Sequence, residues 1–438
     1  MYTFLQNFTF YTFASVSTLY VVHLGLYLVS ANLYDVWRHK HLNRRPQAYA
    51  GPGAQATKSA FPLVSIIISA HNEEAVIVRS LDSLRKITYP NFEVLIADDA
   101  STDRTKQLVR DYILRHPDMR LQIFRMHRNV GKGAALNMLL RRHARGTFVM
   151  TLDADSILRP NTVSNAIAYF GDPTIAGVAA NVRIMDEPTA LGVLQKFEHM
   201  VGYRSKKMYS LLNCEFVVGG VASTYRMSVL QKVGFYDTDT VTEDIGLSIK
   251  ITSLGNHNYR MIYAADVVAM TEGVATFKAL LRQRYRWKYG SFQNLIKYRG
   301  MLFNPSSQYS RMLTMYRLPM AVLSELGLLA TPLTIGYILY MTFVQYNLAF
   351  IVGAYSTITA YMLITIWLDE NLRPAGRLRL SGYAFVSYFI FFIMDIVQLT
   401  GIVRCLRNGQ ALLTQKDVGS AWVSPKRVGK KVQYMYEA

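Results

Sequence analysis

Apolar residues form long runs near both ends of the chain, with the polar residues concentrated between them. Residues 11–33 contain no charged side chain apart from His23, which is usually neutral. A helix needs about 20 apolar residues to cross the hydrocarbon core of a bilayer, so this run predicts a membrane span. Three further apolar runs at 318–345, 347–368 and 382–403 predict a second membrane region.

The distribution of basic residues suggests an orientation for these spans. Lys and Arg cluster at 38–45, directly after the first run. Because Lys and Arg favour the cytoplasmic side, we expect the chain to begin outside and the middle region to be cytoplasmic. Three later spans would then place the basic residues of 406–438 outside, against the same rule. Either the proline-interrupted run 318–345 is not a single span or the tail breaks the rule, and the sequence leaves both open.

One acid, Glu325, lies inside the run 318–345. Acids at membrane depth are usually paired and functional. The alternative is that Glu325 lies near the membrane surface, and the sequence favours neither.

The pattern changes between residues 62 and about 269, where short apolar strands alternate with amphipathic helices. The expected strands are 64–69, 93–97, 121–126 and 147–152, and the expected helices are 73–86, 101–115 and 134–144. This alternation predicts an α/β domain with a mostly parallel sheet covered by helices. In such sheets the ligand binds beyond the carboxyl ends of the strands, where polar clusters follow the predicted strands.

These patterns divide the chain into six expected segments. They are an N-terminal transmembrane helix at 1–36, a basic cytosolic linker at 37–61, a catalytic α/β domain at 62–272, interfacial amphipathic helices at 273–316, C-terminal transmembrane helices at 317–405 and a basic tail at 406–438. The helix expected near 275–300 has one apolar and one strongly basic side, which is typical of a helix lying in the membrane surface.

The amino-acid composition limits the classes of partner that the protein could bind. The formal net charge is +19, which fits nucleic acid, an anionic membrane or an acidic substrate. Much of this charge flanks the apolar runs, so membrane lipid is the favoured partner and a soluble nucleic-acid binder is disfavoured. The only cysteines, Cys214 and Cys405, are too few for a disulfide framework or a CxxC zinc site.

Two acidic pairs follow predicted strands. Asp153 and Asp155 lie two residues apart, and a strand would place them on one face. Both could then reach one Mg²⁺ or Mn²⁺ ion whose shell substrate phosphates complete. Such a pair also often caps a helix. For Asp98 and Asp99 the alternatives are that Asp99, Ser101 or Asp103 caps a helix, or that the two acids accept hydrogen bonds from a base or ribose.

Three other positions carry candidate chemistry. Lys132, between two glycines, offers charge to a phosphate, although a solvated loop lysine is commoner. Glu243 and Asp244 either occupy a helical first turn, favoured by the helix dipole, or supply a general base. In the basic helix, Arg286 could meet a phosphate and Trp287 could stack beside a sugar while the helix lies on the membrane.

Together these motifs resemble the processive family-2 glycosyltransferases with the GT-A fold. The motifs, in chain order, are Ala-His-Asn-Glu (70–73), Asp-Asp-Ala-Ser-Thr-Asp (98–103), Asn-Val-Gly-Lys-Gly-Ala-Ala-Leu-Asn (129–137), Asp-Ala-Asp (153–155), Thr-Glu-Asp (242–244) and Gln-Arg-Tyr-Arg-Trp (283–287). The resemblance covers about residues 60–300. Around 236–245 it is closest to the bacterial poly-β-1,6-N-acetylglucosamine synthases, and it extends to hyaluronan, chitin and cellulose synthases.

The resemblance implies a role for each matching residue. Ser69, His71 and Glu73 would border the nucleotide, with Asp99 contacting uracil and Lys132 facing the phosphates. Asp153 and Asp155 would hold the diphosphate and metal, with Asp155 as the direct metal ligand, and Asp244, beside Glu243, would be the catalytic base. Gln283, Arg286 and Trp287 would close over the diphosphate and the acceptor sugar. Residues 218–226 would line the acceptor site.

The resemblance also implies an activity and a location. It implies an inverting, metal-dependent hexosyltransferase that moves a sugar, most simply N-acetylglucosamine, from a UDP-sugar to a growing polysaccharide. The polymer would cross the cell (inner) membrane through a channel of the C-terminal spans, and a small membrane accessory subunit is compatible with this layout. The rival interpretations are a different polymer synthase, a lipid-linked single-sugar transferase, and a transporter or scaffold with a degenerate cytosolic domain.

Overall fold

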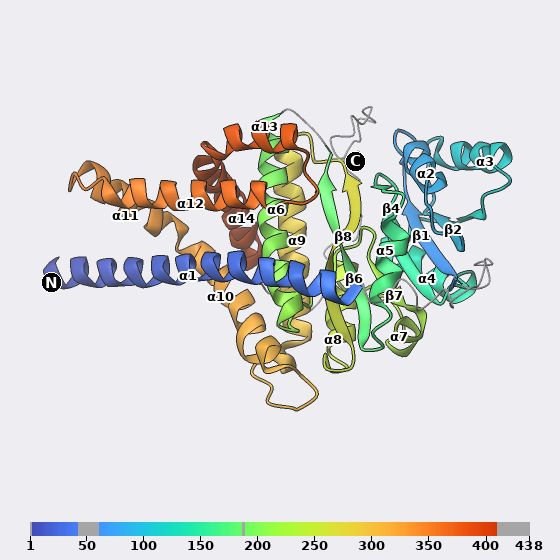
Figure 1. Cartoon of the computed structure of the whole chain (residues 1–438), viewed down its shortest axis with the longest axis horizontal. Helices are drawn as coiled ribbons and strands as arrows, with labels where there is room; N and C mark the ends of the chain where they lie inside the picture. Colours follow the sequence, from blue (N-terminus) through green and yellow to red (C-terminus); the bar gives the residue numbers. More distant parts are fainter. Residues whose placement is uncertain (1, 43–60, 186–188, 410–438) are drawn as a thin grey trace.

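The computed structural model describes residues 2–42, 61–185 and 189–409. It has an α/β domain on one side and a group of long apolar helices on the other, with α6 (Ala190–Leu211) and α9 (Phe277–Lys297) between them (Figure 1). Most of the expected basic linker and nearly all of the expected basic tail lie outside the described residues.

The domain is built on one eight-stranded sheet in the order β3-β2-β1-β4-β7-β6-β8-β5. The strands are β1 (Val64–Ala70), β2 (Phe92–Asp98), β3 (Leu121–Arg125), β4 (Phe148–Asp153), β5 (Ile157–Leu158), β6 (Ile175–Ile184), β7 (Thr224–Arg226) and β8 (Arg260–Thr271). Strands β1 to β4 pair in parallel, as do β6 and β8, whereas β7 and β5 pair antiparallel with their neighbours. The prediction of a mostly parallel sheet is confirmed.

Helices cover both faces of this sheet. Besides α6 and α9, the domain contains α2 (Ile77–Arg85), α3 (Thr105–Arg115), α4 (Lys132–Arg142), α5 (Thr162–Tyr169), α7 (Met227–Lys232) and α8 (Glu243–Thr252). Along β1, Ile66 and Ile68 pack into one hydrophobic core while Ile67 packs into the other. Alternate strand residues point to opposite faces, so a strand buried on both sides has a continuous apolar run.

The predicted elements of the first half agree with the structure to within a few residues. The largest differences are at the helices expected at 73–86 and 101–115, which begin only at Ile77 and Thr105. The residues before Ile77 form a turn in which Asn72 has a φ of 57°. Asn tolerates this left-handed conformation better than most residues, and the turn delays the start of the helix.

The apolar runs form helices. They are α1 (Tyr2–Leu42), the π-helical turn η3 (Met312–Arg317), α10 (Leu318–Leu329), α11 (Thr331–Phe343), α12 (Ala349–Trp367), α13 (Pro374–Ala384) and α14 (Ser387–Arg407). Among the described residues, four helical stretches are long and apolar enough to cross a membrane by length and composition: Phe10–Lys40, Met312–Leu329, Ala349–Trp367 and Ser387–Arg407. The run 318–345 is not one helix, because it divides at Ala330, just before Pro332 in the first turn of α11.

The two C-terminal candidate spans have different surroundings. Helix α12 extends away from the domain beside α1, whereas α14 lies along α9 (Figure 1). Met394 and Val397 of α14 pack in one cluster with Leu280 of α9. At its far end, Asn408 donates a hydrogen bond to the Tyr285 hydroxyl at 3.0 Å. Helix α14 therefore follows α9 over most of its length.

Glu325 is paired. Lys288 of α9 places its Nζ 2.7 Å from both carboxylate oxygens of Glu325 in α10. Both side chains are about 15% exposed. The pair joins α9 to the apolar helices, and because α9 is itself expected in the membrane surface, this pairing accords with both interpretations of Glu325.

Candidate active site

Four of the predicted nucleotide residues lie at the carboxyl edge of the sheet. Ser69 on β1 is in register with Asp153 on β4, so the ends of these strands are adjacent. Beyond β1, the Nδ1 atom of His71 lies 2.7 Å from the backbone oxygen of Asp99, which follows β2. The Glu73 backbone N–H donates to the Thr105 hydroxyl at 2.8 Å. The end of β1 is thereby fixed to the end of β2.

Asp99 holds the loop that leads to Lys132. Its buried carboxylate accepts hydrogen bonds from the backbone N–H groups of Val130, at 2.8 Å, and Gly131, at 2.9 Å. Gly131 has a φ of 86°, where a side chain would be strained. Asp98 accepts from the Ser101 N–H at 3.1 Å in a turn before α3, and because α3 begins only at Thr105, neither acid of this pair caps that helix.

Lys132 is the centre of an acidic cluster. Its Nζ lies 2.6 Å from Asp153 Oδ1 and 3.3 Å from Glu243 Oε1. Burial alone would lower the pKa of Lys132, but the neighbouring carboxylates raise it above its ordinary value. The lysine therefore stays charged and links the acid at the end of β4 to the acids that begin α8.

Asp244 lies beside this lysine. Burial raises the pKa of Asp244 and the neighbouring charge of Glu243 raises it further, while Lys132 and Arg286 act in the opposite direction. A carboxylate with a raised pKa binds a proton more tightly, which suits a general base. The Ile245 backbone N–H donates to Asp244 Oδ1 at 2.9 Å and orients the group.

Gly220 lets the chain pass close to this cluster. A Cβ atom at this position would lie 3.0 Å from Lys132 Nζ and 3.5 Å from Asp244 Oδ2. The Thr151 hydroxyl of β4 donates to the Gly220 carbonyl at 2.7 Å and fixes the loop. Part of the segment 218–226, expected at the acceptor site, thus lies against the expected base.

Asp155 faces a different direction from Asp153. Strand β4 ends at Asp153, so the strand periodicity that predicted a shared face does not extend to Asp155. Its Oδ1 accepts from the Ser156 hydroxyl at 2.9 Å and the Thr271 hydroxyl at 3.3 Å. In the part of the chain that the structure describes, no group of three or more His, Cys, Asp or Glu side chains could hold a metal ion.

Helix α9 is fixed to the segment that carries the acids. A Cβ atom at Gly290 would clash with the side chain of Thr242, the residue before Glu243. Asn294 Nδ2 donates to the Thr242 hydroxyl at 3.2 Å, and Gln293 Oε1 accepts from the Val241 N–H at 3.0 Å. The sequence analysis missed these contacts, although a glycine inside a helical pattern is itself a signal of close packing.

The three residues expected to close over the substrate are divided between two environments. Arg286 is near enough to Asp244 to lower its pKa. Gln283 Oε1 instead accepts from Arg284 at 2.8 Å, and the Arg284 guanidinium lies 4.1 Å from the centre of the Trp287 ring. Arg284 also pairs with Glu198 of α6, which fixes α9 to α6.

The structure thus brings Lys132, Asp153, Glu243 and Asp244 together, with Arg286 within electrostatic reach of Asp244. Residues 65–234 match the sequence model of Glycosyl transferase family 2. A mannosyltransferase from Pyrobaculum calidifontis, solved in complex with GDP-Man and Mn²⁺, aligns with a TM-score of 0.52 and 21% identity over 91% of this chain and 99% of that one. This likeness shows the fold, and the predicted GT-A fold is confirmed.

Two relatives are similar in sequence. Poly-beta-1,6-N-acetyl-D-glucosamine synthase of Staphylococcus epidermidis is 29% identical over 237 residues, which cover 53% of this chain and 56% of the relative. The synthase of the same name from Staphylococcus aureus is 26% identical over 284 residues, which cover 64% of this chain and 65% of the relative. The matching region therefore spans less than two thirds of these relatives.

Proposed function

On the premise that this chain is a glycosyltransferase built on a family 2 domain, we propose that it transfers N-acetylglucosamine from a UDP-sugar to a growing polysaccharide. The names of the two staphylococcal relatives support this sugar and a β-1,6-linked product. The observation that carries the proposal is the cluster of Asp153, Glu243 and Asp244 around Lys132 at the ligand-binding edge of the sheet.

The donor would lie along the carboxyl edge of the sheet. Ser69, His71 and Glu73 would border the nucleoside. Asp99 would contact the base through acceptor capacity that its two bonds to the loop leave over, because each carboxylate oxygen can accept more than one hydrogen bond. The diphosphate would then lie toward Lys132, whose ammonium group offsets its negative charge.

The residues present fit a divalent cation. Three carboxylates, those of Asp153, Glu243 and Asp244, stand against the cations Lys132 and Arg286, so negative charge is in excess in this cluster. Asp153 and Asp155 would hold Mg²⁺ or Mn²⁺, since these ions accept one or two carboxylates and take further oxygens from water and substrate phosphates. A bound cation would neutralise charge on the departing diphosphate.

Asp244 would act as the base. It would remove the proton from the acceptor hydroxyl as that oxygen attacks the anomeric carbon and UDP leaves from the opposite face. A single displacement of this kind inverts the anomeric configuration. Gly220 supports the assignment, because its missing side chain lets the segment expected at the acceptor site lie close to Asp244.

Helix α9 would position the reacting groups. Arg286 would face the diphosphate, with Gln283 and Trp287 nearer the acceptor sugar. The attachment of α9 at Thr242 means that the helix and the base move together. Because small displacements of reacting groups cost large factors in rate, this attachment would matter for turnover.

The enzyme would be a multi-pass protein of the cell membrane with its domain in the cytoplasm. We propose that α1, the kinked pair α10 and α11, and α12 cross the bilayer and form the polymer path. Helix α14 would lie along α9 in the membrane surface, which keeps the basic tail in the cytoplasm and satisfies the positive-inside rule. A small membrane accessory subunit would contact the exposed sides of the spans.

Membranes containing the protein would test the reaction with radiolabelled UDP-N-acetylglucosamine, UDP-glucose and UDP-glucuronate in parallel. We expect polymer from the first donor only. Polymer from another donor would identify a hyaluronan-, chitin- or cellulose-type synthase, and a single-sugar lipid product would identify the lipid-linked transferase. If purified protein released no UDP from any donor, the transporter or scaffold interpretation would replace the enzyme.

A reporter fused after Ala438 would test the orientation. Alkaline phosphatase is active only outside the cytoplasm, so the fusion should be inactive while a green fluorescent protein fusion fluoresces. The opposite pair of results would show that α14 crosses the membrane.

A further inference from the structure

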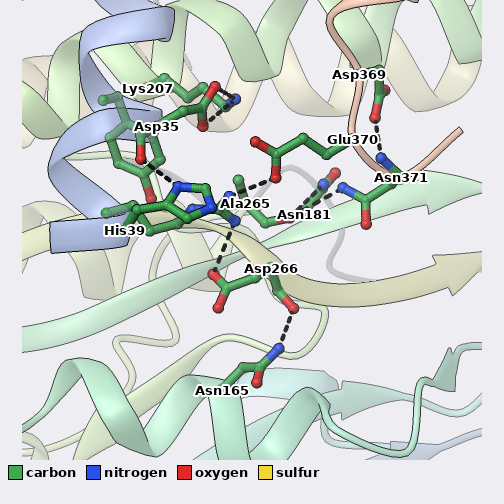
Figure 2. Close-up of polar contacts among 12 residues, drawn as sticks. Asp35, His39, Asn165, Asn181, Lys207, Ala265, Asp266, Asp369, Glu370 and Asn371 are labelled. Atoms are coloured by element: carbon green, nitrogen blue, oxygen red, sulfur yellow. Dashed lines mark hydrogen bonds and ion pairs between the residues drawn. The ribbon is translucent and has the colours of Figure 1, made fainter. Parts of the chain in front are cut away.

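A second charged region lies where the domain meets the apolar helices. A small open pocket is formed by β6, β8, α6, the end of α12 and the loop that follows it. Figure 2 shows Asp35 of α1 beside Lys207 of α6, with Asp266 of β8 and Asp369 and Glu370 of this loop in the same region. Asn32 and Asp35 of α1 contact two of the basic side chains that line the pocket. If α1 and α12 cross the bilayer as proposed above, the pocket would lie near the level of the membrane surface.

Most charges in this region are paired. Arg183 makes two contacts of 2.7 Å with the carboxylate of Asp369. Lys207 places its Nζ 2.7 Å from both oxygens of Asp35. Glu370 accepts from Arg38 at 2.5 Å. These pairs connect α1, α6 and the loop after α12 to the domain.

Arg204 is the exception. It lines the pocket and is only 5% exposed, yet it makes no ion pair among the described residues. Its hydrogen-bond partner is Asn32 Oδ1, at the long distance of 3.4 Å, and its Nε is buried without an acceptor. Burial lowers the pKa of Arg204, but a guanidinium keeps its charge in proteins. A buried charge without a counter-ion is costly.

Among the cations that line the pocket, Arg204 is the one without an ion pair in the described part of the chain. Arg183 pairs with Asp369 and Lys207 with Asp35, while Glu370 pairs with Arg38, which also lies 3.9 Å from Asp266. An anion with several oxygens could accept two parallel hydrogen bonds from the planar guanidinium of Arg204. Thr365, at the end of α12, also lines the pocket and adds a hydroxyl group.

We propose that this pocket binds a phosphate group, with the guanidinium of Arg204 as its main donor. At this depth the phosphate of an anionic phospholipid headgroup has the required chemistry, as does free inorganic phosphate. The bound phosphate would supply the counter-ion that Arg204 lacks. It would also connect α6 of the domain to α1 and α12.

Lipid retention by the full chain in detergent micelles tests the proposal. Phosphatidylglycerol, and phosphatidylcholine as a zwitterionic reference, would be titrated and bound lipid counted by native mass spectrometry. We expect the wild-type protein to retain one phosphatidylglycerol, and Arg204→Gln to bind it about tenfold more weakly, because one charge-assisted interaction is lost. Arg110→Gln, which removes an exposed charge on α3, should bind as the wild type does.

A second arm uses inorganic phosphate as a competitor and as the sole ligand. Displacement of the lipid by phosphate would show that both use the same site. Binding of phosphate but not lipid, with the same dependence on Arg204, would identify the free anion as the ligand. If neither binds the wild-type protein, or if Arg204→Gln binds as tightly as the wild type, the proposal is wrong.

Arg204→Lys provides a check that does not depend on the loss of charge. The ammonium group keeps the charge but loses the planar fork, so we expect binding between those of the wild type and Arg204→Gln. If Arg204→Gln failed to fold, this variant and the wild type would decide the matter. Because no readout uses sugar transfer, a negative result here leaves the proposed enzyme activity untouched.

Discussion

The acidic cluster around Lys132 and the basic pocket around Arg204 are opposite solutions to the burial of charge. In the first, carboxylates outnumber cations at the edge of a sheet, and the imbalance favours a metal ion. In the second, Arg38, Arg183 and Lys207 each pair with at least one acid, whereas the buried guanidinium of Arg204 has no ion pair among the described residues and favours an anion. The sign of the unmatched charge, and not the number of ion pairs, indicates what each region would bind.

Among changes to the acidic cluster, replacement of Asp244, the proposed base, should reduce sugar transfer the most. Asp244→Asn keeps the shape of the side chain but cannot accept a proton, so transfer should fall by about 10²–10⁴-fold. UDP binding should be unchanged, because the expected metal ligands remain. Polymer synthesis by membranes and UDP binding by calorimetry measure the two quantities. Near-normal turnover of this variant would remove Asp244 from the mechanism.

Replacement of Asp155, the proposed direct metal ligand, should have the next largest effect. Asp155→Asn should lose metal-dependent UDP binding and transfer, by about 10-fold or more in affinity, because one anionic ligand is replaced by a neutral one. Chelation of the wild-type protein with EDTA should have the same consequence, and Mn²⁺ or Mg²⁺ should restore it. Metal-independent UDP binding by both proteins would contradict the assignment. Asp118→Asn, which changes an exposed acid outside the expected site, is the control.

The attachment of α9 to the acidic cluster should have a smaller effect. Gly290→Ala places a methyl group against Thr242, so α9 must shift, and we expect turnover to fall by about 10–100-fold with little change in UDP affinity. Gly202→Ala in α6 meets no atom within 4 Å and should be silent. Equal activities for the two variants would show that the contact at Gly290 does not position α9.

The pH dependence should be the smallest effect. Burial raises the pKa of Asp244 above its ordinary value of 3.8, and the group works only when deprotonated. Turnover should therefore fall as the pH decreases through this raised pKa, at a higher pH than an exposed aspartate would give. A profile of turnover against pH measures this. A flat profile down to the ordinary aspartate pKa would contradict the effect of burial.

The sequence predicted the first half of the domain well because its strands are buried on both faces. An apolar run such as 64–68 is stable only when it is buried in the sheet between helices. Because the parallel strands end at the same edge of the sheet, the polar clusters that follow them lie at that edge. The family resemblance likewise implied that Lys132 and the two acids of α8 belong to one active site.

Other features depend on tertiary contacts that periodicity does not contain. Asp153 contacts Lys132 whereas Asp155 contacts Thr271, because β4 ends at Asp153 and the strand periodicity stops there. The course of α14 depends on its packing against α9, although its composition alone matches a membrane span. Arg204 gave no signal in the sequence, since an arginine in an amphipathic helix is usually solvated.

The two hydrogen bonds from Asp99 to the loop before Lys132 bear on donor selectivity. The acid expected to read the base is joined, through Val130 and Gly131, to the lysine expected to face the phosphates. A donor with a mismatched base would disturb both ends of this connection. Discrimination between nucleotides would then appear in the catalytic rate as well as in donor affinity.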